Sequence, residues 1–301
     1  MTTAAARRPS VLVGLIGEGI APSLSPALHE LEGARHGMNY VYRTIEITAA
    51  EAAPAGMDAL LDAARRLGFD GLNITHPAKQ TVLGALDALS PGAAAVGAVN
   101  TVVFDGGRAV GHNTDVTGFG AAMDDDLAGC ARDLVVLLGA GGAGAAVARA
   151  LLDRAVADLV IVDADERRAR ALAEASDARA ATMAELPALL ADADGLVNAT
   201  PMGMAAHPGA AVDVALLHAR MFVADIVYRP VETALLAGAR ERGCRVMAGT
   251  GMAMHQAADA FEIFTGEAAD RRAMLADLED LIAAEADGSP ASRGHRKGEE
   301  E

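Results

Sequence analysis

Short apolar runs alternate along the chain with longer stretches in which Ala, Leu and Arg recur at helical spacing. Apolar runs of about 4–8 residues bounded by turn residues are typical of buried strands, and longer periodic stretches are typical of helices. In the first half we expect strands at 11–17, 41–47 and 69–75, and helices at 26–37 and 57–68. Strands that alternate with helices predict an α/β protein with a mainly parallel sheet.

The apolar pattern lapses over residues 111–129 and then resumes. The second half repeats the theme, with strands expected at 134–139, 158–164, 195–200, 222–228 and 244–249. This break predicts two α/β domains. The first spans 10–117 and the second spans 118–254. The motifs and the resemblance given below imply that the first, completed by C-terminal helices at 255–285, is the substrate-binding and catalytic domain, and that the second is a doubly wound Rossmann domain. Residues 286–301 lack large apolar side chains and are expected to be a disordered tail.

Composition narrows the possible functions. The 301 residues carry 41 acidic and 25 basic side chains, a formal charge of −16, and no tryptophan. This balance argues against nucleic acid as a partner, because phosphate neutralisation needs clustered Lys and Arg. The two cysteines, Cys130 and Cys244, are far apart and the histidines are scattered, so we expect no metal and a cytoplasmic location. No apolar run is long enough for a membrane helix. The sequence leaves a monomer or a homodimer open.

A glycine-rich turn opens the second domain. Gly139, Gly141 and Gly144 form the pattern G-x-G-x-x-G directly after one expected strand and before a helix, with Gly142 and Ala143 between them. In a dinucleotide site these glycines allow a tight turn, close approach of the pyrophosphate and close packing of helix on strand. The free N–H groups of the helix then face the phosphates. The strand–turn–helix context favours a dinucleotide site over a packing role alone.

The next strand bears on the choice of cofactor. Asp163 stands near its end, where a carboxylate can accept hydrogen bonds from both adenosine ribose hydroxyls. A 2′-phosphate beside this carboxylate would be repelled, so NAD is favoured over NADP. Arg168 could lie over the adenine or ribose, whereas Arg167 is expected to be a solvated helix residue. NADP thus stays the less favoured alternative.

Several polar residues of the first half follow apolar strands, where parallel sheets place their ligand sites. Each has a structural alternative: helix caps at Ser25 and Asp115, a turn at Asn100 and a surface position at Lys79. Their joint placement favours a pocket for a polyhydroxylated acid, formed by Ser23, Ser25, Asn73, Thr75, Lys79, Asn100 and Asp115.

These residues lie in a series of motifs that resembles the shikimate/quinate dehydrogenase family over about residues 11–282. The motifs are "SLSPALH", "GLNITHPAKQ", "GAVNTVV", "GHNTDVTGF", "GAGGAGAA", "NATPMGM", "DIVYRPVET" and "GTGMAMHQAADAFEIFTG". The chain looks most like the actinobacterial NAD-dependent quinate/shikimate branch. The resemblance implies interconversion of quinate or shikimate with their 3-dehydro forms by hydride transfer at C3.

The resemblance also implies roles for individual residues. Lys79 is the acid/base and Asp115 its partner, which suits lysine because arginine would not release its proton. Ser23 and Ser25 would bind the substrate carboxylate. The remaining substrate contacts would come from Asn73, Thr75, Asn100, Tyr228 and Gln256. Thr200, Pro201, Met202, Ile226 and Gly249 would flank the nicotinamide.

Alternatives remain open at this stage. They are an NADP-dependent biosynthetic shikimate dehydrogenase, an aminoshikimate dehydrogenase, a non-catalytic NAD-binding regulator and a methylene-tetrahydrofolate-type dehydrogenase. Asp163 disfavours the first, the presence of both Lys79 and Asp115 disfavours the regulator, and the Ser23/Ser25 pair disfavours the last. Serine at position 25 leaves the preference between quinate and shikimate open, and the sequence indicates no role for His76.

Overall fold

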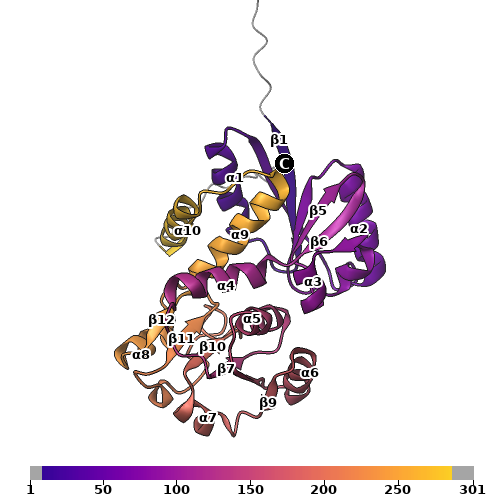
Figure 1. Ribbon diagram of the computed structural model, residues 1–301. Helices are drawn as coiled ribbons and strands as arrows, with labels where there is room; N and C mark the ends of the chain where they lie inside the picture. Colours follow the sequence, from indigo (N-terminus) through magenta and orange to yellow (C-terminus); the bar gives the residue numbers. More distant parts are fainter. Residues whose placement is uncertain (1–8, 287–301) are drawn as a thin grey trace, which may run out of the picture.

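The first half of the chain forms a six-stranded sheet in the computed structural model, which describes residues 9–286 (Figure 1). The strand order is β2-β1-β3-β5-β6-β4, and β2, β1 and β3 are parallel. The strands are β1 (Ser10–Gly17), β2 (Asn39–Glu46), β3 (Gly71–Ile74), β4 (Ala88–Leu89), β5 (Thr101–Asp105) and β6 (Arg108–His112). The three strands expected in this half are therefore confirmed as β1, β2 and β3.

The first sheet is mixed: three of its five strand pairs are parallel, as the prediction of a mainly parallel sheet requires, and two are antiparallel. β5 runs antiparallel to both β3 and β6, and the sequence pattern had indicated none of β4, β5 and β6 as strands. Gly106 and Gly107 join β5 to β6 with φ values of 56° and 81°. A two-residue turn with both φ values positive matches the twist of a hairpin and needs glycine-like residues. The hairpin was missed because the apolar runs on either side of this turn are short.

Helices cover both faces of this first sheet. The expected helices are confirmed as α1 (Ser25–Arg35) and α2 (Pro54–Arg66). Two further helical segments of this unit are η1 (Thr81–Ala85) and α3 (Pro91–Val96). Met57 and Leu61 of α2 pack with Leu72 and Ile74 on one face. On the other face, Val13 and Tyr42 pack against the end of α9 (Gly249–Thr265). The α9 residues in this contact are Phe261 and Phe264, whose rings are buried. The last helix, α10 (Arg271–Ala286), follows α9.

The second sheet has the order β12-β11-β10-β7-β8-β9, with every neighbouring pair parallel. Its strands are β7 (Leu134–Leu138), β8 (Asp158–Val162), β9 (Arg179–Ala181), β10 (Gly195–Asn198), β11 (Phe222–Asp225) and β12 (Arg245–Met247). The five strands expected here are confirmed, and β9 is additional. The connecting elements are α5 (Gly142–Leu152), α6 (Glu166–Ser176), α7 (Leu186–Asp192), η2 (Val214–Leu216) and α8 (Ala234–Glu241). This is the doubly wound arrangement of a Rossmann domain.

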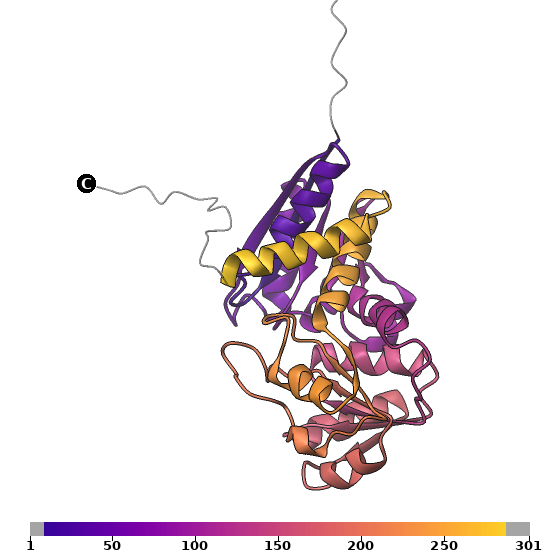
Figure 2. The ribbon, with the colours of Figure 1, turned by 90° about the vertical axis from the view of Figure 1, so that its left-hand side faces the viewer.

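Two helices connect the sheets. α4 (Thr114–Asp126) and α9 pack on each other between the two units, as Figures 1 and 2 show. The predicted division between residues 117 and 118 falls inside α4, and the domain limits stay predictions. Of the tail predicted at 286–301, Ala286 is the last residue of α10, and the rest of that range, 287–301, lies outside the described residues. No helix in the described part of the chain has the length and apolar character to cross a bilayer.

Candidate active site

A cavity of about 390 Å³ lies where the two units meet. This volume falls in the range of small-molecule sites. The structure brings together many of the site residues expected from sequence, and their roles stay predictions. Those that line the cavity are Ser23, Ser25, Asn73, Thr75, Lys79, Asn100, Asp115, Ala143, Ile226, Tyr228 and Gln256.

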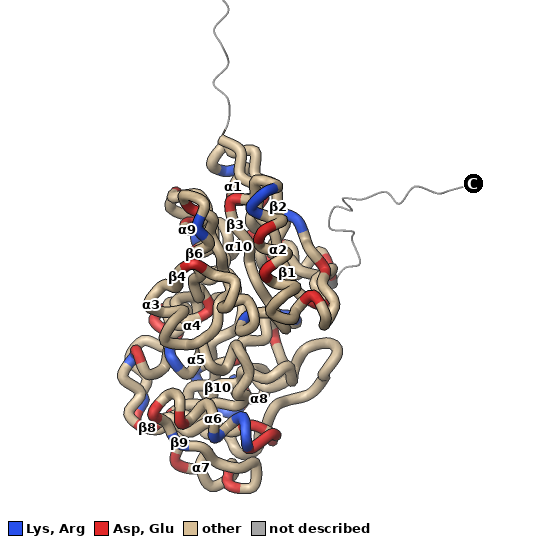
Figure 3. Tube along the Cα trace, turned by 90° about the vertical axis from the view of Figure 1, so that its right-hand side faces the viewer, with Lys and Arg blue, Asp and Glu red and all other residues tan. Residues whose placement is uncertain are grey.

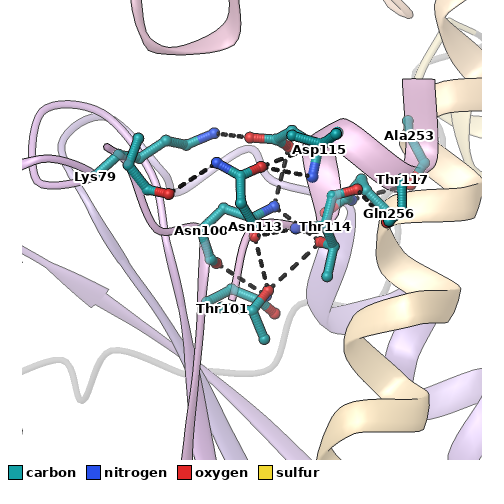
Figure 4. Close-up of polar contacts among 12 residues, drawn as sticks. Lys79, Asn100, Thr101, Asn113, Thr114, Asp115, Thr117, Ala253 and Gln256 are labelled. Carbon is teal, nitrogen blue, oxygen red and sulfur yellow. Dashed lines mark hydrogen bonds and ion pairs between the residues drawn. The ribbon is translucent and has the colours of Figure 1, made fainter. Parts of the chain in front are cut away.

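An ion pair between Lys79 and Asp115 forms part of the cavity wall (Figure 4). Lys79 lies in the turn after β3, and Asp115 lies in the first turn of α4. The Lys79 Nζ donates to Asp115 Oδ2 at 2.6 Å, and the two side chains are 19% and 10% exposed. The Asn113 side chain caps α4 by accepting hydrogen bonds from the backbone N–H groups of Asp115 and Val116 at 3.1 and 3.3 Å. This cap fixes the first turn and with it the Asp115 carboxylate.

Asn100 holds the other oxygen of Asp115. Its Nδ2 donates to Asp115 Oδ1 at 3.0 Å and to Thr114 Oγ1 at 2.9 Å. Its Oδ1 accepts from the Thr114 backbone N–H at 2.8 Å and from the Thr101 hydroxyl at 3.0 Å. Because donors and acceptors on both sides fix the amide, Asn100 is not merely a turn residue (Figure 4). The network presents Asp115 to Lys79 in one orientation.

The side-chain amide of Asn73 is hydrogen-bonded to other residues of the cavity wall and its surroundings. Its Nδ2 donates to Thr101 Oγ1 at 3.0 Å and to the Asn100 carbonyl at 3.3 Å, and its Oδ1 accepts from the Tyr42 hydroxyl at 2.8 Å. The amide therefore braces the cavity wall, and its predicted contact with a substrate stays a prediction. Gln256, on α9, donates to the Ala253 carbonyl at 3.0 Å and is partly exposed to the cavity.

The two serines stand at the start of α1. Ser25 is the first helical residue and Leu24 occupies the N-cap position, so the alternative of Ser25 as the cap is wrong. The Ser25 backbone N–H donates to Ser23 Oγ at 3.3 Å, and both serines line the cavity. Burial raises the pKa of Tyr228, whose phenol therefore stays protonated at neutral pH and can donate a hydrogen bond.

Sequence reasoning missed His29, which also lines the cavity. Its Nδ1 lies 3.1 Å from the Tyr40 hydroxyl, and its ring centroid lies 5.0 Å from that of Tyr42. Burial lowers the pKa of His29 to about 3, so the imidazole is neutral in the folded protein. The signal available in the sequence was the position of His29 on the buried face of α1, four residues after Ser25.

A consequence is a loss of stability in mild acid. Below about pH 6.5 the unfolded chain protonates His29 and the folded chain does not, so the free energy of unfolding falls as pH falls between these two pKa values. Between pH 7 and pH 5 this group should remove about 2 kcal/mol. Urea titrations at pH 7 and at pH 5 measure how much unfolding free energy is lost between the two pH values. This loss should be about 2 kcal/mol smaller in His29→Gln than in the wild type. The exposed His76 supplies a control, since His76→Gln should keep the wild-type difference. Equal losses in all three proteins would contradict the assignment.

The glycine-rich turn fits a dinucleotide phosphate. Gly139 has a φ of 98°, and a Cβ there would come within 2.8 Å of the Ala199 carbonyl oxygen. A Cβ on Gly144 would lie 2.0 Å from the Gly139 carbonyl oxygen, so only glycine lets α5 approach the strand this closely. A Cβ on Gly141 would meet nothing within 4 Å, which leaves open space at the start of α5. Gly141 is also the N-cap of α5 and has no capping side chain, so the N–H groups of the first turn are available to a phosphate.

Asp163 stands directly after β8 at the edge of this turn. Its Oδ2 accepts from the Ala140 backbone N–H at 2.7 Å, and its Oδ1 accepts from the Asp165 backbone N–H at 2.8 Å. These bonds fix the carboxylate beside the glycine-rich turn. Arg168 is exposed on α6, where basic and acidic residues follow one another along the chain (Figure 3). Arg167 pairs with Asp165 in this surface.

The residues expected around a nicotinamide lie after β10 and β11. Thr200 Oγ1 donates to Asn198 Oδ1 at 2.6 Å, and Asn198 Nδ2 donates to Asp225 Oδ1 at 2.9 Å. Burial raises the pKa of Asp225, which also accepts from the Thr233 hydroxyl. Sequence reasoning missed this network, which holds the loop after β10.

Met204, rather than Met202, lines the cavity. Met202 is 36% exposed, and the adjacent Pro201 is also exposed. Gly249 packs against the chain after β11, since a Cβ there would lie 2.6 Å from the Ile226 carbonyl oxygen. Within residues 9–286, no cluster of three or more His, Cys, Asp and Glu side chains could hold a metal ion.

Comparison with known proteins agrees with this architecture. Family models match a shikimate dehydrogenase substrate binding domain at 15–102, a shikimate/quinate 5-dehydrogenase domain at 123–236 and a shikimate 5′-dehydrogenase C-terminal domain at 249–279. A shikimate dehydrogenase (NADP(+)) of Streptomyces avermitilis is 56% identical over 90% of this chain and 96% of its own length. A quinate/shikimate dehydrogenase (NAD(+)) of Corynebacterium glutamicum is 50% identical over 85% and 94%.

A solved structure is similar throughout. Quinate dehydrogenase from Corynebacterium glutamicum, in complex with NAD, aligns with a TM-score of 0.86 and 47% identity, over 91% of this chain and all of that one. The fold and the cleft thus define a two-domain oxidoreductase that uses a nicotinamide cofactor. The chain belongs to the shikimate/quinate dehydrogenase family.

Proposed function

We propose that the protein interconverts quinate with 3-dehydroquinate and shikimate with 3-dehydroshikimate, with NAD as its cofactor. The observation that carries the proposal is the Lys79–Asp115 ion pair in the wall of a cavity whose lining also contains several hydroxyl and amide side chains. A group that exchanges a proton with a substrate must be exposed to the binding cavity. The Lys79 side chain lines this cavity, and the Asp115 carboxylate holds its amine.

The proposed chemistry is a proton transfer at Lys79. When bound, the nicotinamide supplies the acceptor for the hydride that leaves C3. In the oxidation, the neutral amine of Lys79 takes the proton of the C3 hydroxyl, and in the reduction the ammonium returns it. Asp115 accepts from Lys79 and Asn100, and its carboxylate so stabilises the ammonium that forms. Closure of the cavity would exclude water from this exchange.

The remaining cavity residues would orient an anionic, polyhydroxylated ring. Ser23 and Ser25 present hydroxyls that can donate to a carboxylate, and Tyr228 adds a neutral phenol nearby. Thr75, Asn100 and Gln256 would contact the ring hydroxyls, and Asn73 would support them. A site built to hydrogen-bond hydroxyls strongly disfavours analogues that lack them.

The cofactor would be held by the second unit. The start of α5, with Gly139, Gly141, Gly142, Ala143 and Gly144, would bind the pyrophosphate. Thr200, Pro201, Met202, Ile226 and Gly249 would surround the nicotinamide. Asp163 would accept from the ribose hydroxyls, with Arg168 near the adenine. The fixed Asp163 carboxylate supports NAD over NADP, because a 2′-phosphate would meet a like charge.

This cofactor proposal predicts a defined result for Asp163→Asn. The wild type should oxidise shikimate and quinate with a higher kcat/KM for NAD than for NADP. Asparagine keeps the size and one acceptor but removes the charge, so the NAD:NADP ratio of kcat/KM should fall by about tenfold, equivalent to about 1.4 kcal/mol. Initial rates with both cofactors and both substrates measure this ratio.

The matched control is Asp165→Asn, which removes a carboxylate two residues away and preserves an N-cap for α6. Its ratio should stay at the wild-type value. A wild type that prefers NADP would identify the alternative, a biosynthetic shikimate dehydrogenase. Activity with neither substrate would point to an aminoshikimate-type substrate. The cytoplasmic location and the choice between monomer and homodimer stay predictions from the sequence.

A further inference from the structure

Arg229 links the two units at the cavity. It follows β11 in the Rossmann unit, and its Nη1 donates to the Pro22 carbonyl oxygen in the substrate-binding unit at 2.9 Å. The same nitrogen lies 3.0 and 2.8 Å from the two carboxylate oxygens of Glu285, in the last turn of α10. One guanidinium therefore ties together three segments that are far apart in the sequence.

The tied segment is the one that carries the two serines. Pro22 directly precedes Ser23, and both residues line the cavity together with Arg229. The Ser23 backbone N–H donates to the Ile20 carbonyl at 2.9 Å, so the segment is a tight turn, and Arg229 holds this turn through the Pro22 carbonyl. Holding that carbonyl fixes where the Ser23 hydroxyl points.

The guanidinium is itself well fixed. Its Cζ lies 5.6 Å from the centroid of the Tyr228 ring, a cation–π distance, and Tyr228 lines the same cavity. Arg229 and Glu285 keep 26% and 34% of their side-chain surface exposed, so the pair stands at the rim rather than in the interior. A guanidinium has five N–H donors in a plane, and each Nη carries two of them. Arg229 Nη1 can therefore donate to the Pro22 carbonyl and to the Glu285 carboxylate at the same time.

We propose that Arg229 is a positioning residue for the carboxylate end of the substrate, and that it acts by fixing the Pro22–Ser25 segment against the Rossmann unit. This inference rests on the proposed function, in which Ser23 and Ser25 bind the carboxylate. The carboxylate is remote from the carbon that reacts, so the contacts are equally strong in the bound substrate and in the transition state. Loss of such uniform binding raises KM and leaves kcat unchanged.

The test is Arg229→Met, assayed with shikimate and the cofactor that the wild type prefers. KM for shikimate should rise about tenfold, while kcat and KM for the dinucleotide stay within about twofold. Arg229→Lys should recover a part of the loss, because an ammonium can still donate to the Pro22 carbonyl. Glu285→Gln is the matched control: it removes the ion pair, leaves the bond to Pro22 and should stay within about threefold of the wild-type KM.

Each other outcome would overturn the proposal. An unchanged KM for shikimate in Arg229→Met would show that the segment does not depend on the link. Equal rises in both KM values, without recovery in Arg229→Lys, would show a general loosening of the two units. A tenfold rise in Glu285→Gln would assign the effect to the ion pair. Failure of the wild type to turn over shikimate or quinate with either cofactor would instead contradict the proposed function, and this inference with it.

Discussion

Replacing Lys79 by methionine is expected to lower kcat by between about 10² and 10⁴, because the C3 hydroxyl then has no base to take its proton. The chain contains only two lysines, Lys79 and Lys297, so no other lysine of residues 9–286 could replace it. Lys79→Arg should be as inactive, since a guanidinium pairs with Asp115 but keeps its proton. Steady-state rates in both directions measure the loss.

The structural control for Lys79 is the binding of the dinucleotide. Calorimetric titration should give the same cofactor affinity in Lys79→Met and the wild type, because the glycine-rich turn lies in the other unit. Asp115→Asn should lower kcat less than Lys79→Met, since asparagine can still accept from the amine while losing the charge that stabilises the ammonium. A Lys79→Met protein with wild-type turnover would remove the acid/base proposal, and unchanged function in cells would favour the non-catalytic regulator.

A second large effect is expected on stability, from Arg35→Met. Glu32 of α1 is completely buried, and its carboxylate pairs with Arg35 and accepts from the Asp270 backbone N–H at 2.8 Å. His36 Nε2 lies 3.0 Å from Glu32 Oε1, the oxygen that also accepts from the Asp270 N–H, whereas Arg35 pairs with Oε2. Removing Arg35 leaves a buried carboxylate without its main cation, which should cost about 3 kcal/mol of unfolding free energy. Urea titration at pH 7 measures the change.

A double variant tests the cause of this loss. Glu32→Gln in the Arg35→Met background removes the uncompensated charge and keeps an acceptor for the Asp270 N–H, so it should restore part of the stability. The exposed pair Arg179–Asp158 supplies the comparison, and Arg179→Met should cost less than about 1 kcal/mol. A double variant less stable than Arg35→Met would show that the Glu32 carboxylate still stabilises the fold without Arg35, and would contradict the account based on an uncompensated charge.

The sequence predicted the strands whose apolar runs are continuous, because burial on both faces of a parallel sheet demands such runs. Val135, Val136 and Leu137 of β7 are fully buried, and the pattern located that strand to within a residue. It missed β5 and β6, whose hairpin depends on two glycines with positive φ rather than on an apolar run. Length and periodicity indicate burial, and they carry little information about tight turns.

The candidate site was predicted in outline for a different reason. Because 36 residues separate Lys79 from Asp115, only the family motifs indicated that the two residues act together. Their ion pair follows from the positions of β3 and α4 in the fold. The sequence could not indicate that Asn73 would be bonded to Tyr42 and Thr101, nor that Met204 would line the cavity. His29 and Arg229 were missed because their partners come from other segments, which a local pattern does not describe.

The return of α9 to the first sheet has a consequence for synthesis on the ribosome. Val13 and Tyr42 pack against Phe261 and Phe264 of α9, which is synthesised after all the strands of both sheets. The parallel sheet between Leu134 and Met247 has all its strands before α9 is made. The unit synthesised first should therefore be the last to complete its fold, and its nascent N-terminal strands should stay open to chaperones until the polypeptide is released.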